Sequence, residues 1–299
     1  MNKRISLFIW TLLSLLPVGM VFGEVDFPSL GEGNPYQRYP GKIIWHDLFT
    51  SVPGEMAAFY ESIFGWESEV QDLDGRKVYL MWSGGYPVAG IIERAKVDGD
   101  SEGGIWIAYA SVNSVDSVSS AVIAAGGRIL VQKGELPGRG EHGILQDNQG
   151  AIFGVLKSST GDPGEYMPNV GDFFWAQHLS RDAAVAAEFY ETVGTYKINK
   201  DKRFAGPQLF LLSSGGFARA GISPLADEAP TDKADWIHFI RVESIEDTLG
   251  KLSGTGAKVL LPPNEDILEG RLAILSDPAG ALVGIMQAAS NVTNQEGGQ

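Results

Sequence analysis

The chain has 299 residues, a formal net charge of −14 at pH 7 and no cysteine. The lack of cysteine excludes disulfides and thiolate metal sites. The acidic balance argues against nucleic-acid binding, because phosphates are bound by clusters of lysine and arginine. A hydrophobic fraction of 44% is that of an ordinary globular protein, and the length favours one large or two medium domains.

The first 23 residues have the pattern of a secretory signal peptide. Lys3 and Arg4 precede an apolar run over residues 5–16, which Pro17 ends. A membrane anchor is the alternative, but a spanning helix needs roughly 18 or more apolar residues in succession. We therefore expect an exported protein, periplasmic or secreted, with an N-terminal extension over 24–40 and no stable membrane span after cleavage.

An internal repeat divides the remaining chain. The segment WHDLFTSVPGEMAAFYE, which starts at Trp45, matches WAQHLSRDAAVAAEFYE, which starts at Trp175. The same offset of 130 residues aligns Asp147 with Asp277. A repeat of this length predicts two homologous domains, and the Gly- and Pro-containing stretch between them predicts a linker. The predicted segments are the first domain (41–158), the linker (159–170), the second domain (171–288) and a disordered tail (289–299).

Each domain is itself predicted to contain two similar halves. In the first half, KIIWHDLF indicates a strand, and the next segment places Met56, Phe59, Tyr60 and Phe64 at helical spacing before Gly65 ends the helix. Short strands are predicted around an SGG turn, and the same order recurs from IWIAYASV onward. We therefore predict an α+β fold of four βαβββ modules. An all-parallel α/β fold would need a helix between every pair of strands.

These features resemble the vicinal oxygen chelate superfamily, which includes glyoxalase I, extradiol dioxygenases, and fosfomycin- and bleomycin-resistance proteins. The resemblance rests on the helix bearing AAFYESIFGW, on AAGGRIL, and on DNQGAIFGV and DPAGALVGI at the ends of the domains. It covers nearly all of both domains and is strongest to a tandem-domain subgroup. It implies that the modules pair into two cup-shaped, glyoxalase-like domains. In metal-dependent members, His, Gln or Glu ligands lie on the first and last strands of each module.

The positions at which the family carries metal ligands hold other residue types in this chain. The first-strand positions lie at a fixed spacing before the Phe-Tyr pair in one half-module and before Val112 in the other. Divalent cations bind imidazole nitrogen or carboxylate oxygen, so we expect neither a metal nor another cofactor. These positions are Trp45, Gly90, Ile107 and Gly154 in the first domain, and Trp175, Gly221, Ile237 and Gly284 in the second.

His46 and Asp47 form an adjacent pair that resembles two metal ligands. Side chains alternate along a strand, so if Trp45 and Asp47 face into the cup, then Ile44, His46 and Leu48 face the helices. We therefore interpret His46 as an interface or core histidine. The same interpretation applies to two further histidines, His178 and His238. His142, in the GELPGRG-EHG region where we expect a flap, is a weak candidate for substrate contact.

The inner faces of the cups are predicted to bind a small organic molecule. Aromatic walls with a few polar groups are typical of ligand pockets, and an indole attracts a cation by ~0.5 to 2 kcal/mol. The alternative is that Trp45 and Trp175 simply fill the cups as core residues. The expected ligand-binding residues are Trp45, Asp47, Tyr109, Trp175, Gln177, Phe239 and Arg241.

Asp47 is the candidate catalytic residue, because a carboxyl group in an apolar cup has a raised pKa and can act as a general base. Its counterpart, Gln177, has no such capacity. Two other functions stay open at this point. One is a glyoxalase- or dioxygenase-like lyase or isomerase, metal-dependent through displaced residues such as His46 or metal-independent through Asp47. The other is a scaffold for protein interaction, because one fold hosts many functions.

Overall fold

The structure is a computed structural model that describes residues 27–288, except for 32, 74, 96–102, 137, 195, 201–208, 226–230 and 232. The signal peptide expected over 1–23 and the tail expected over 289–299 lie outside the described residues. Among the helices of the described part, none is long and apolar enough to cross a membrane.

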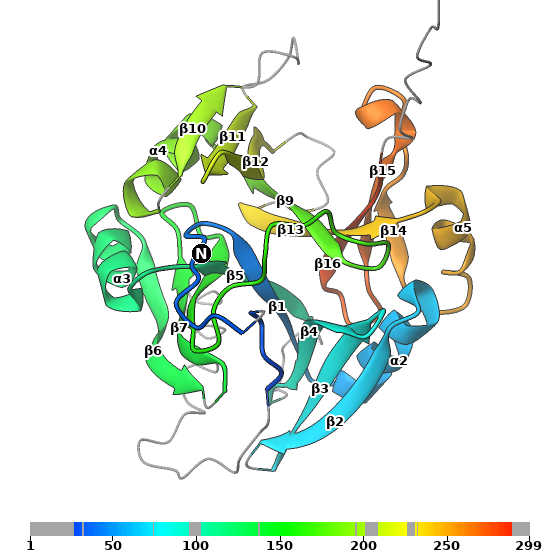
Figure 1. Ribbon diagram of the computed structural model, residues 1–299. Coiled ribbons are helices and arrows are strands. Elements are labelled where there is room, and N and C mark those ends of the chain that lie inside the picture. The colour runs from blue at the N-terminus through cyan, green and yellow to red at the C-terminus, as the bar shows by residue number, and fades with distance from the viewer. Residues whose placement is uncertain are drawn as a thin grey trace, which may run out of the picture.

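Two eight-stranded mixed sheets form the body of the protein (Figure 1). The first has the order β2-β3-β4-β1-β5-β8-β7-β6, and the second repeats it as β10-β11-β12-β9-β13-β16-β15-β14. Each half-sheet is built from one strand, one helix and three strands. The predicted α+β fold of four βαβββ modules, paired into two glyoxalase-like domains, is therefore confirmed.

The first domain contains β1 (Ile43–Thr50), α2 (Pro53–Phe64), β2 (Glu67–Leu73), β3 (Arg76–Ser83), β4 (Tyr86–Glu93), β5 (Ile105–Ser111), α3 (Val115–Ala124), β6 (Arg128–Leu136), β7 (Gly140–Gln146) and β8 (Ile152–Ser158). The second contains β9 (Phe173–Ser180), α4 (Ala183–Val193), β10 (Lys197–Lys200), β11 (Phe210–Ser214), β12 (Phe217–Pro224), β13 (Asp235–Val242), α5 (Ile245–Gly250), β14 (Lys258–Leu261), a 3-10 turn (Leu268–Gly270), β15 (Leu272–Ser276) and β16 (Leu282–Gln287).

Capping residues set the helix ends. The side chains of Ser114, Asp182 and Ser244 accept hydrogen bonds from backbone N–H groups in the first turns of α3, α4 and α5, which otherwise have no partner. Helix α2 instead has Pro53 in its first turn and ends at Gly65. The φ of 72° at Gly65 is in the left-handed region that glycine adopts most easily.

The four central strands of each sheet position the inner face of the cup. In the first domain, β1 pairs antiparallel with β5, whereas β4 and β8 run parallel to β1 and β5. The register places Trp45 beside Tyr109, Asp47 beside Gly90, and Tyr109 beside Gly154. Residues from both modules therefore meet on one concave surface.

A bulge at the start of β1 corrects one sequence expectation. The β1–β5 register shifts between Ile43 and Trp45, so strict alternation fails before Trp45. Ile44 packs with Trp45 in the cup rather than facing the helices, and the prediction for Ile44 was wrong. Ile43 takes the helix-side position instead.

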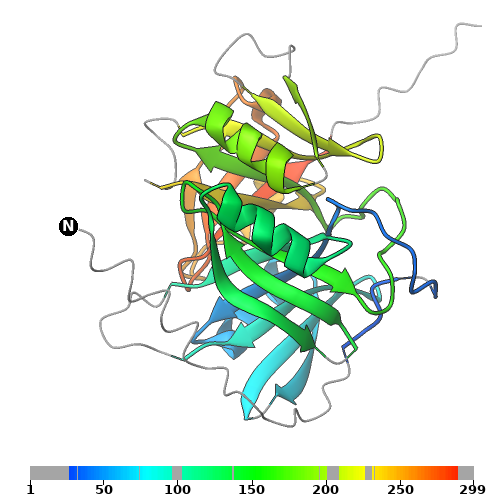
Figure 2. The same cartoon turned by 90° about the vertical axis from the view of Figure 1, so that its left-hand side faces the viewer.

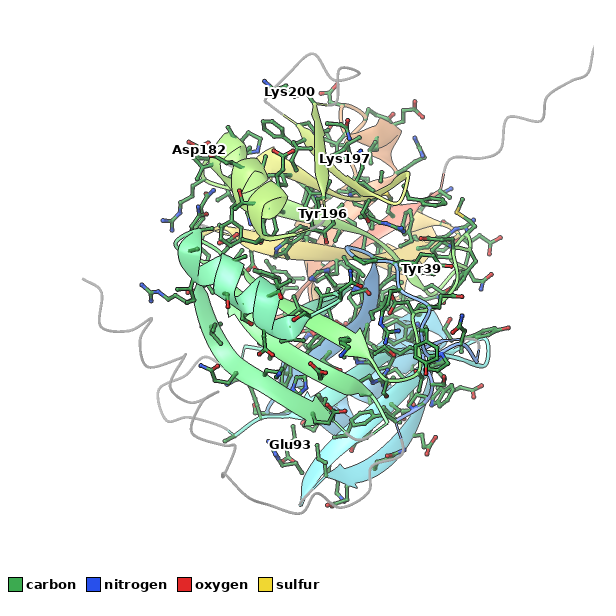
Figure 3. All side chains as sticks on the ribbon, turned by 60° about the vertical axis from the view of Figure 1, so that its left-hand side comes forward. Tyr39, Glu93, Asp182, Tyr196, Lys197 and Lys200 are labelled. Atoms are coloured by element: carbon green, nitrogen blue, oxygen red, sulfur yellow. The ribbon has the colours of Figure 1, made fainter. Side chains whose placement is uncertain are left out.

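The two domains pack against each other through their helix-bearing faces. Helices α3 and α4, from different domains, lie side by side (Figure 2). Tyr196, which follows α4, lies at the junction between the domains (Figure 3), and its hydroxyl donates to the carbonyl of Gly41 at 2.9 Å. The hydrophobic core is therefore shared between the domains.

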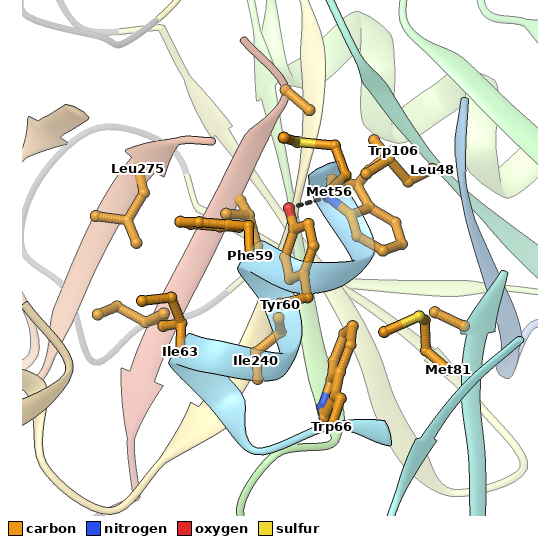
Figure 4. Close-up of a cluster of buried hydrophobic side chains, with 14 of the residues drawn as sticks. Leu48, Met56, Phe59, Tyr60, Ile63, Trp66, Met81, Trp106, Ile240 and Leu275 are labelled. Carbon is orange, nitrogen blue, oxygen red and sulfur yellow. Dashed lines mark hydrogen bonds between the residues drawn. The ribbon is translucent and has the colours of Figure 1, made fainter. Parts of the chain in front are cut away.

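A buried polar link fixes the interface on the side of α2. The Trp106 indole donates to the Tyr60 hydroxyl at 2.8 Å (Figure 4). That hydroxyl donates to Asp277 of the second domain at 3.1 Å. Around this link, α2 packs Met56 and Ile63 on the second sheet. Each hydrogen bond to a charged group contributes roughly 1.5–3 kcal/mol.

The same link recurs with the domains exchanged. Trp236 donates to the Tyr190 hydroxyl at 2.9 Å, and Tyr190 donates to Asp147 of the first domain at 3.0 Å. His178 adds a contact that has no counterpart at the other link, with its Nε2 2.8 Å from the Asp147 carboxylate. The other Asp147 oxygen accepts backbone N–H groups of its own turn. The recurring Asp-x-x-Gly motif therefore joins the domains.

Candidate functional site

The inner face of the first domain, here called cup one, brings together the three predicted residues Trp45, Asp47 and Tyr109. The Trp45 indole N–H donates to Asp47 Oδ1 at 2.7 Å, and the Tyr109 hydroxyl also hydrogen-bonds this carboxylate. All three side chains are buried. Their clustering follows from the register of β1 and β5, as alternation predicted.

Arg139 is a residue of cup one that sequence reasoning missed. It lies in the segment expected to be a flap, which forms the hairpin between β6 and β7. Its guanidinium carbon lies 3.8 Å from the centre of the Trp45 ring and 5.0 Å from that of Phe27. The cation that stacks on Trp45 is thus the protein's own. The position of Arg139 could not be predicted from the sequence, because the residue pattern of a glycine-rich hairpin does not fix the direction of a single arginine side chain.

The Arg139 guanidinium is buried without a hydrogen-bond acceptor. The residue is 2% exposed, and none of its three guanidinium nitrogens has a hydrogen-bond partner among the described residues. Burial lowers the pKa of Arg139 to about 10, while the nearby Asp47 acts in the opposite direction. The group therefore stays cationic at neutral pH, in an environment where an unpaired charge is costly.

Asp47 is a buried carboxyl group with a perturbed pKa. Burial raises the pKa of Asp47 to about 6, although the hydrogen bonds from Trp45 and Tyr109 and the charge of Arg139 all act to lower it. A carboxyl group with this pKa exchanges protons near neutral pH. The raised pKa expected for Asp47 is thus present in the structure.

The glycines of cup one have no open space beside them. A Cβ atom on Gly90 would lie 2.5 Å from Asp47 Oδ1, and one on Gly154 would lie 2.4 Å from the Tyr109 ring. The Asp47 and Tyr109 side chains therefore occupy the space beside these glycines, at positions where the resemblance places metal ligands.

The segment before β1 covers cup one and is tied to the linker. Phe27 is 8% exposed and packs with residues of β3. Further along, Asp162 of the linker is fully buried and accepts hydrogen bonds from the Tyr39 backbone at 2.6 Å and the Ser111 hydroxyl at 2.5 Å. Ser111 thus anchors the linker.

The equivalent surface of the second domain, cup two, is less closed. The Trp175 indole donates to Gln177 at 3.2 Å, and Gln177 donates to Ser223 at 3.2 Å. Trp175 and Gln177 are both partly exposed, and Phe239 is buried beneath them. The Arg241 guanidinium donates to the carbonyl of Pro168 in the linker, so this residue is held by the linker.

Three of the four histidines, His46, His178 and His238, lie away from the inner faces of the cups. The His46 ring stacks on Phe173 of the second domain with centroids 3.8 Å apart, and it lies 5.2 Å from His238. His178 is bonded to Asp147 at the domain interface. His142 of β7 differs, because it pairs with Leu156 and so lies on the inner face of cup one, as Leu156 does. The interpretation of His46 as an interface residue agrees with this geometry.

The residues at the family's metal positions do not fit a divalent cation. They are tryptophan, isoleucine and glycine, none of which has a metal-binding side chain, and neighbouring side chains already fill the space at the glycines. Within the described residues, no group of three His, Cys, Asp or Glu side chains is close enough to hold a metal ion. Cup one contains acid–base groups and an arginine in place of metal ligands.

Comparison with known proteins gives relatives of the same two-domain length. No family model matches the chain. The "Putative glyoxylase CFP32" of Mycobacterium tuberculosis (strain CDC 1551 / Oshkosh) is 26% identical over 247 residues, which is 82% of this chain and 94% of that protein. The anthracycline biosynthesis protein DnrV of Streptomyces peucetius is 23% identical over 272 residues, covering 87% and 98%.

Solved structures share the fold at lower identity. The Mn(II)-bound glyoxalase from Novosphingobium aromaticivorans superposes with a TM-score of 0.56 at 15% identity, covering 84% of this chain and 83% of that one. The 2,2',3-trihydroxybiphenyl 1,2-dioxygenase of Sphingomonas wittichii strain RW1 gives 0.53 at 12%, covering 83% and 91%. These likenesses concern the fold alone.

Proposed function

We propose that this chain, which has the tandem-domain, glyoxalase-like fold and lacks ligands at the metal positions that the fold implies, binds a small organic anion in cup one. The observation that carries the proposal is the buried Arg139 guanidinium without an acceptor. The relatives named for a glyoxylase and for anthracycline biosynthesis support a small organic molecule as the class of ligand.

The chemistry of Arg139 favours a carboxylate. A guanidinium presents its N–H donors in a planar fork that matches the two oxygens of a carboxylate. Leaving these donors unpaired in a buried site costs free energy, which a bound anion recovers. The adjoining Trp45 ring gives an aromatic or planar ligand a surface on which to stack.

Phe27 controls access in this proposal. Its ring lies 5.0 Å from the Arg139 guanidinium, and it belongs to the segment that covers the cup. A ligand that pairs with Arg139 must displace this ring. We therefore expect Phe27→Ala to strengthen binding, because the ligand no longer competes with the phenyl ring.

Calorimetric titration with benzoate and with its neutral isostere benzamide tests the proposal. We expect benzoate to bind the wild type and Arg139→Met to weaken that binding by at least about tenfold, which corresponds to about 1.4 kcal/mol. Benzamide should bind weakly to both. The exposed Arg128→Met serves as the matched control and should leave benzoate affinity unchanged.

The stability of the ligand-free variant separates binding from a purely structural role. If Arg139 only packs on Trp45, Arg139→Met loses a cation–π contact and the protein becomes less stable. If the arginine is kept for a ligand, removing a buried guanidinium whose N–H donors have no acceptor leaves the ligand-free protein equally or more stable. Failure of benzoate and related arylcarboxylates to bind, together with destabilisation by Arg139→Met, would overturn the proposal.

A second candidate function is acid–base catalysis on a small carbonyl compound bound in cup one. The pKa of about 6 at Asp47, raised by burial, favours it. Asp47 would exchange a proton with a ligand held by Arg139, and Tyr109 would orient the carboxylate. Turnover of methylglyoxal, with and without a thiol, tests this function. Activity that Asp47→Asn abolishes while benzoate affinity is kept supports it, and equal activity in both proteins contradicts it.

Export is also part of the proposal. The basic, apolar and small-residue pattern of the first 23 residues supports it. Mass spectrometry of the protein recovered from the periplasm or medium should give a mature chain that begins close to Glu24. An intact N-terminus on cytoplasmic protein would contradict export.

A further inference from the structure

A cavity of about 230 Å³ lies between the two domains, on the opposite side of the sheets from the cups. The first domain contributes residues of β5, β8 and the start of α3, and the second contributes the end of α4 with parts of β12 and β13. Its walls are mainly apolar and aromatic, with Phe153, Tyr190, Tyr196 and Trp236 among them. Neither the fold nor the proposed function uses this space.

The internal repeat explains why this side of the domain interface has a cavity. The repeat that relates the domains also relates this cavity to a second region of the interface, around α2. There, Phe173, Ile240 and Trp66 are packed in the core. Larger side chains therefore fill the α2 side. The equivalent pairs are Phe173 and Ile43, Ile240 and Ala110, Phe64 and Gly194, and Trp66 and Tyr196, with the filling residue given first.

A polar group is buried against this cavity. His238 lines it and is 2% exposed, and neither ring nitrogen has a hydrogen-bond partner within the described residues. Its equivalent in the first domain, Ala108, lines the same cavity. Burial lowers the pKa of His238 to about 3, and the neutral ring therefore offers one N–H donor and one nitrogen acceptor.

The cavity can be reached from the surface. Asn113 and Ser117, which are exposed at the start of α3, are part of its lining. For comparison, an apolar cavity of about 150 Å³ in another protein binds benzene. The space here is thus large enough for a single or fused aromatic ring.

We propose that this interdomain cavity is a second binding site, which takes a neutral aromatic molecule with one hydrogen-bonding group directed at His238. The aromatic and apolar walls match a ring. The histidine selects for one N–H or O–H group, because a ligand without it leaves the buried ring nitrogens unpaired. Charged ligands are excluded by the apolar walls.

Titration with phenol, indole and toluene tests the site. We expect the wild type to bind phenol and indole, and to bind toluene about tenfold more weakly, the contribution of about one hydrogen bond. The double variant Ile43→Phe, Ala110→Ile copies the filled side of the interface. It should abolish binding of all three compounds while the thermal midpoint stays the same or rises.

Three further variants keep the test decisive. His238→Ala should still bind toluene but lose the preference for phenol, because only the hydrogen bond is removed. Ile240→Val, on the filled side, is the matched control and should bind as the wild type does. Arg139→Met should also bind normally, so that failure of cup one and failure of this site are distinguishable. Absence of wild-type binding, or unchanged binding by the folded double variant, would overturn the proposal.

Discussion

Replacing Asp47 with asparagine removes a buried charge and keeps the shape of the side chain. The amide oxygen can still accept the Trp45 indole N–H that Asp47 accepts at 2.7 Å. The amide nitrogen can donate to the Tyr109 hydroxyl, which then accepts instead of donating. The chain already uses this arrangement in cup two, where Gln177 accepts from Trp175.

The expected gain in stability follows from the pKa of Asp47. Burial raises it from 3.8 to about 6, which corresponds to about 3 kcal/mol at about 1.4 kcal/mol per unit. The folded protein keeps the Asp47 proton up to about pH 6, whereas the unfolded chain loses it near pH 3.8. Wild-type stability therefore falls as the pH rises through this window, and the full cost is present above it.

Urea unfolding of the wild type and Asp47→Asn between pH 4 and pH 8 measures this effect. We expect nearly equal free energies of unfolding at pH 4 and a variant more stable by up to about 3 kcal/mol at pH 8. The exposed Asp266→Asn is the control and should show no such pH-dependent difference. An Asp47→Asn variant that is less stable at pH 8, or a stability difference independent of pH, would show that the ionised Asp47 carboxylate does not destabilise the folded protein.

Three further predictions test the fold and the cup. Asp147→Asn should lose roughly 1–3 kcal/mol of unfolding free energy at pH 7, because it disturbs the buried hydrogen bonds of Asp147 with His178 and Tyr190. Asp277→Asn should cause no loss or a gain, as Asp47→Asn does, because burial raises the pKa of Asp277 to about 6 and a neutral group is favoured there. For Asp147, burial acts to raise the pKa, but His178 and backbone N–H groups lower it overall. The stability that the ionised Asp147 contributes should therefore be lost as the pH falls below the ordinary aspartate range. Asp277 should show the opposite dependence, because its pKa is raised. Gly154→Ala should cost about 1–3 kcal/mol through its clash with the Tyr109 ring, and Tyr109→Ala should remove most of that cost in a double-mutant cycle. Elemental analysis of the purified protein should find substoichiometric divalent metal, and stoichiometric metal with an anomalous peak inside a cup would contradict the proposed metal-free binding.

The inner face of cup one could be predicted in part from the sequence. Alternation along β1, combined with the internal repeat, placed Trp45, Asp47 and Tyr109 on one surface, because the strand period is a local property. The same rule failed at Ile44, where a bulge changes the register of β1 against β5. A bulge depends on the pairing of two strands and leaves no mark in the alternation of one.

The residues that cover cup one could not be predicted from the sequence. Arg139 enters it from a hairpin, and Phe27 reaches it from a segment with no regular structure. Their positions depend on contacts far apart in the sequence, such as those of Asp162 with the segment before β1. The reciprocal packing of the domains was likewise hidden, although the Asp-x-x-Gly motifs that make it were visible as family features.

A crystal structure of the protein with benzoate tests the central proposal most directly. We expect the carboxylate to pair with the Arg139 guanidinium, the phenyl ring to lie against Trp45, and Phe27 to move from its present position. Benzoate bound only elsewhere, or absent at a concentration that saturates binding in solution while Arg139 stays packed between Trp45 and Phe27, would contradict it.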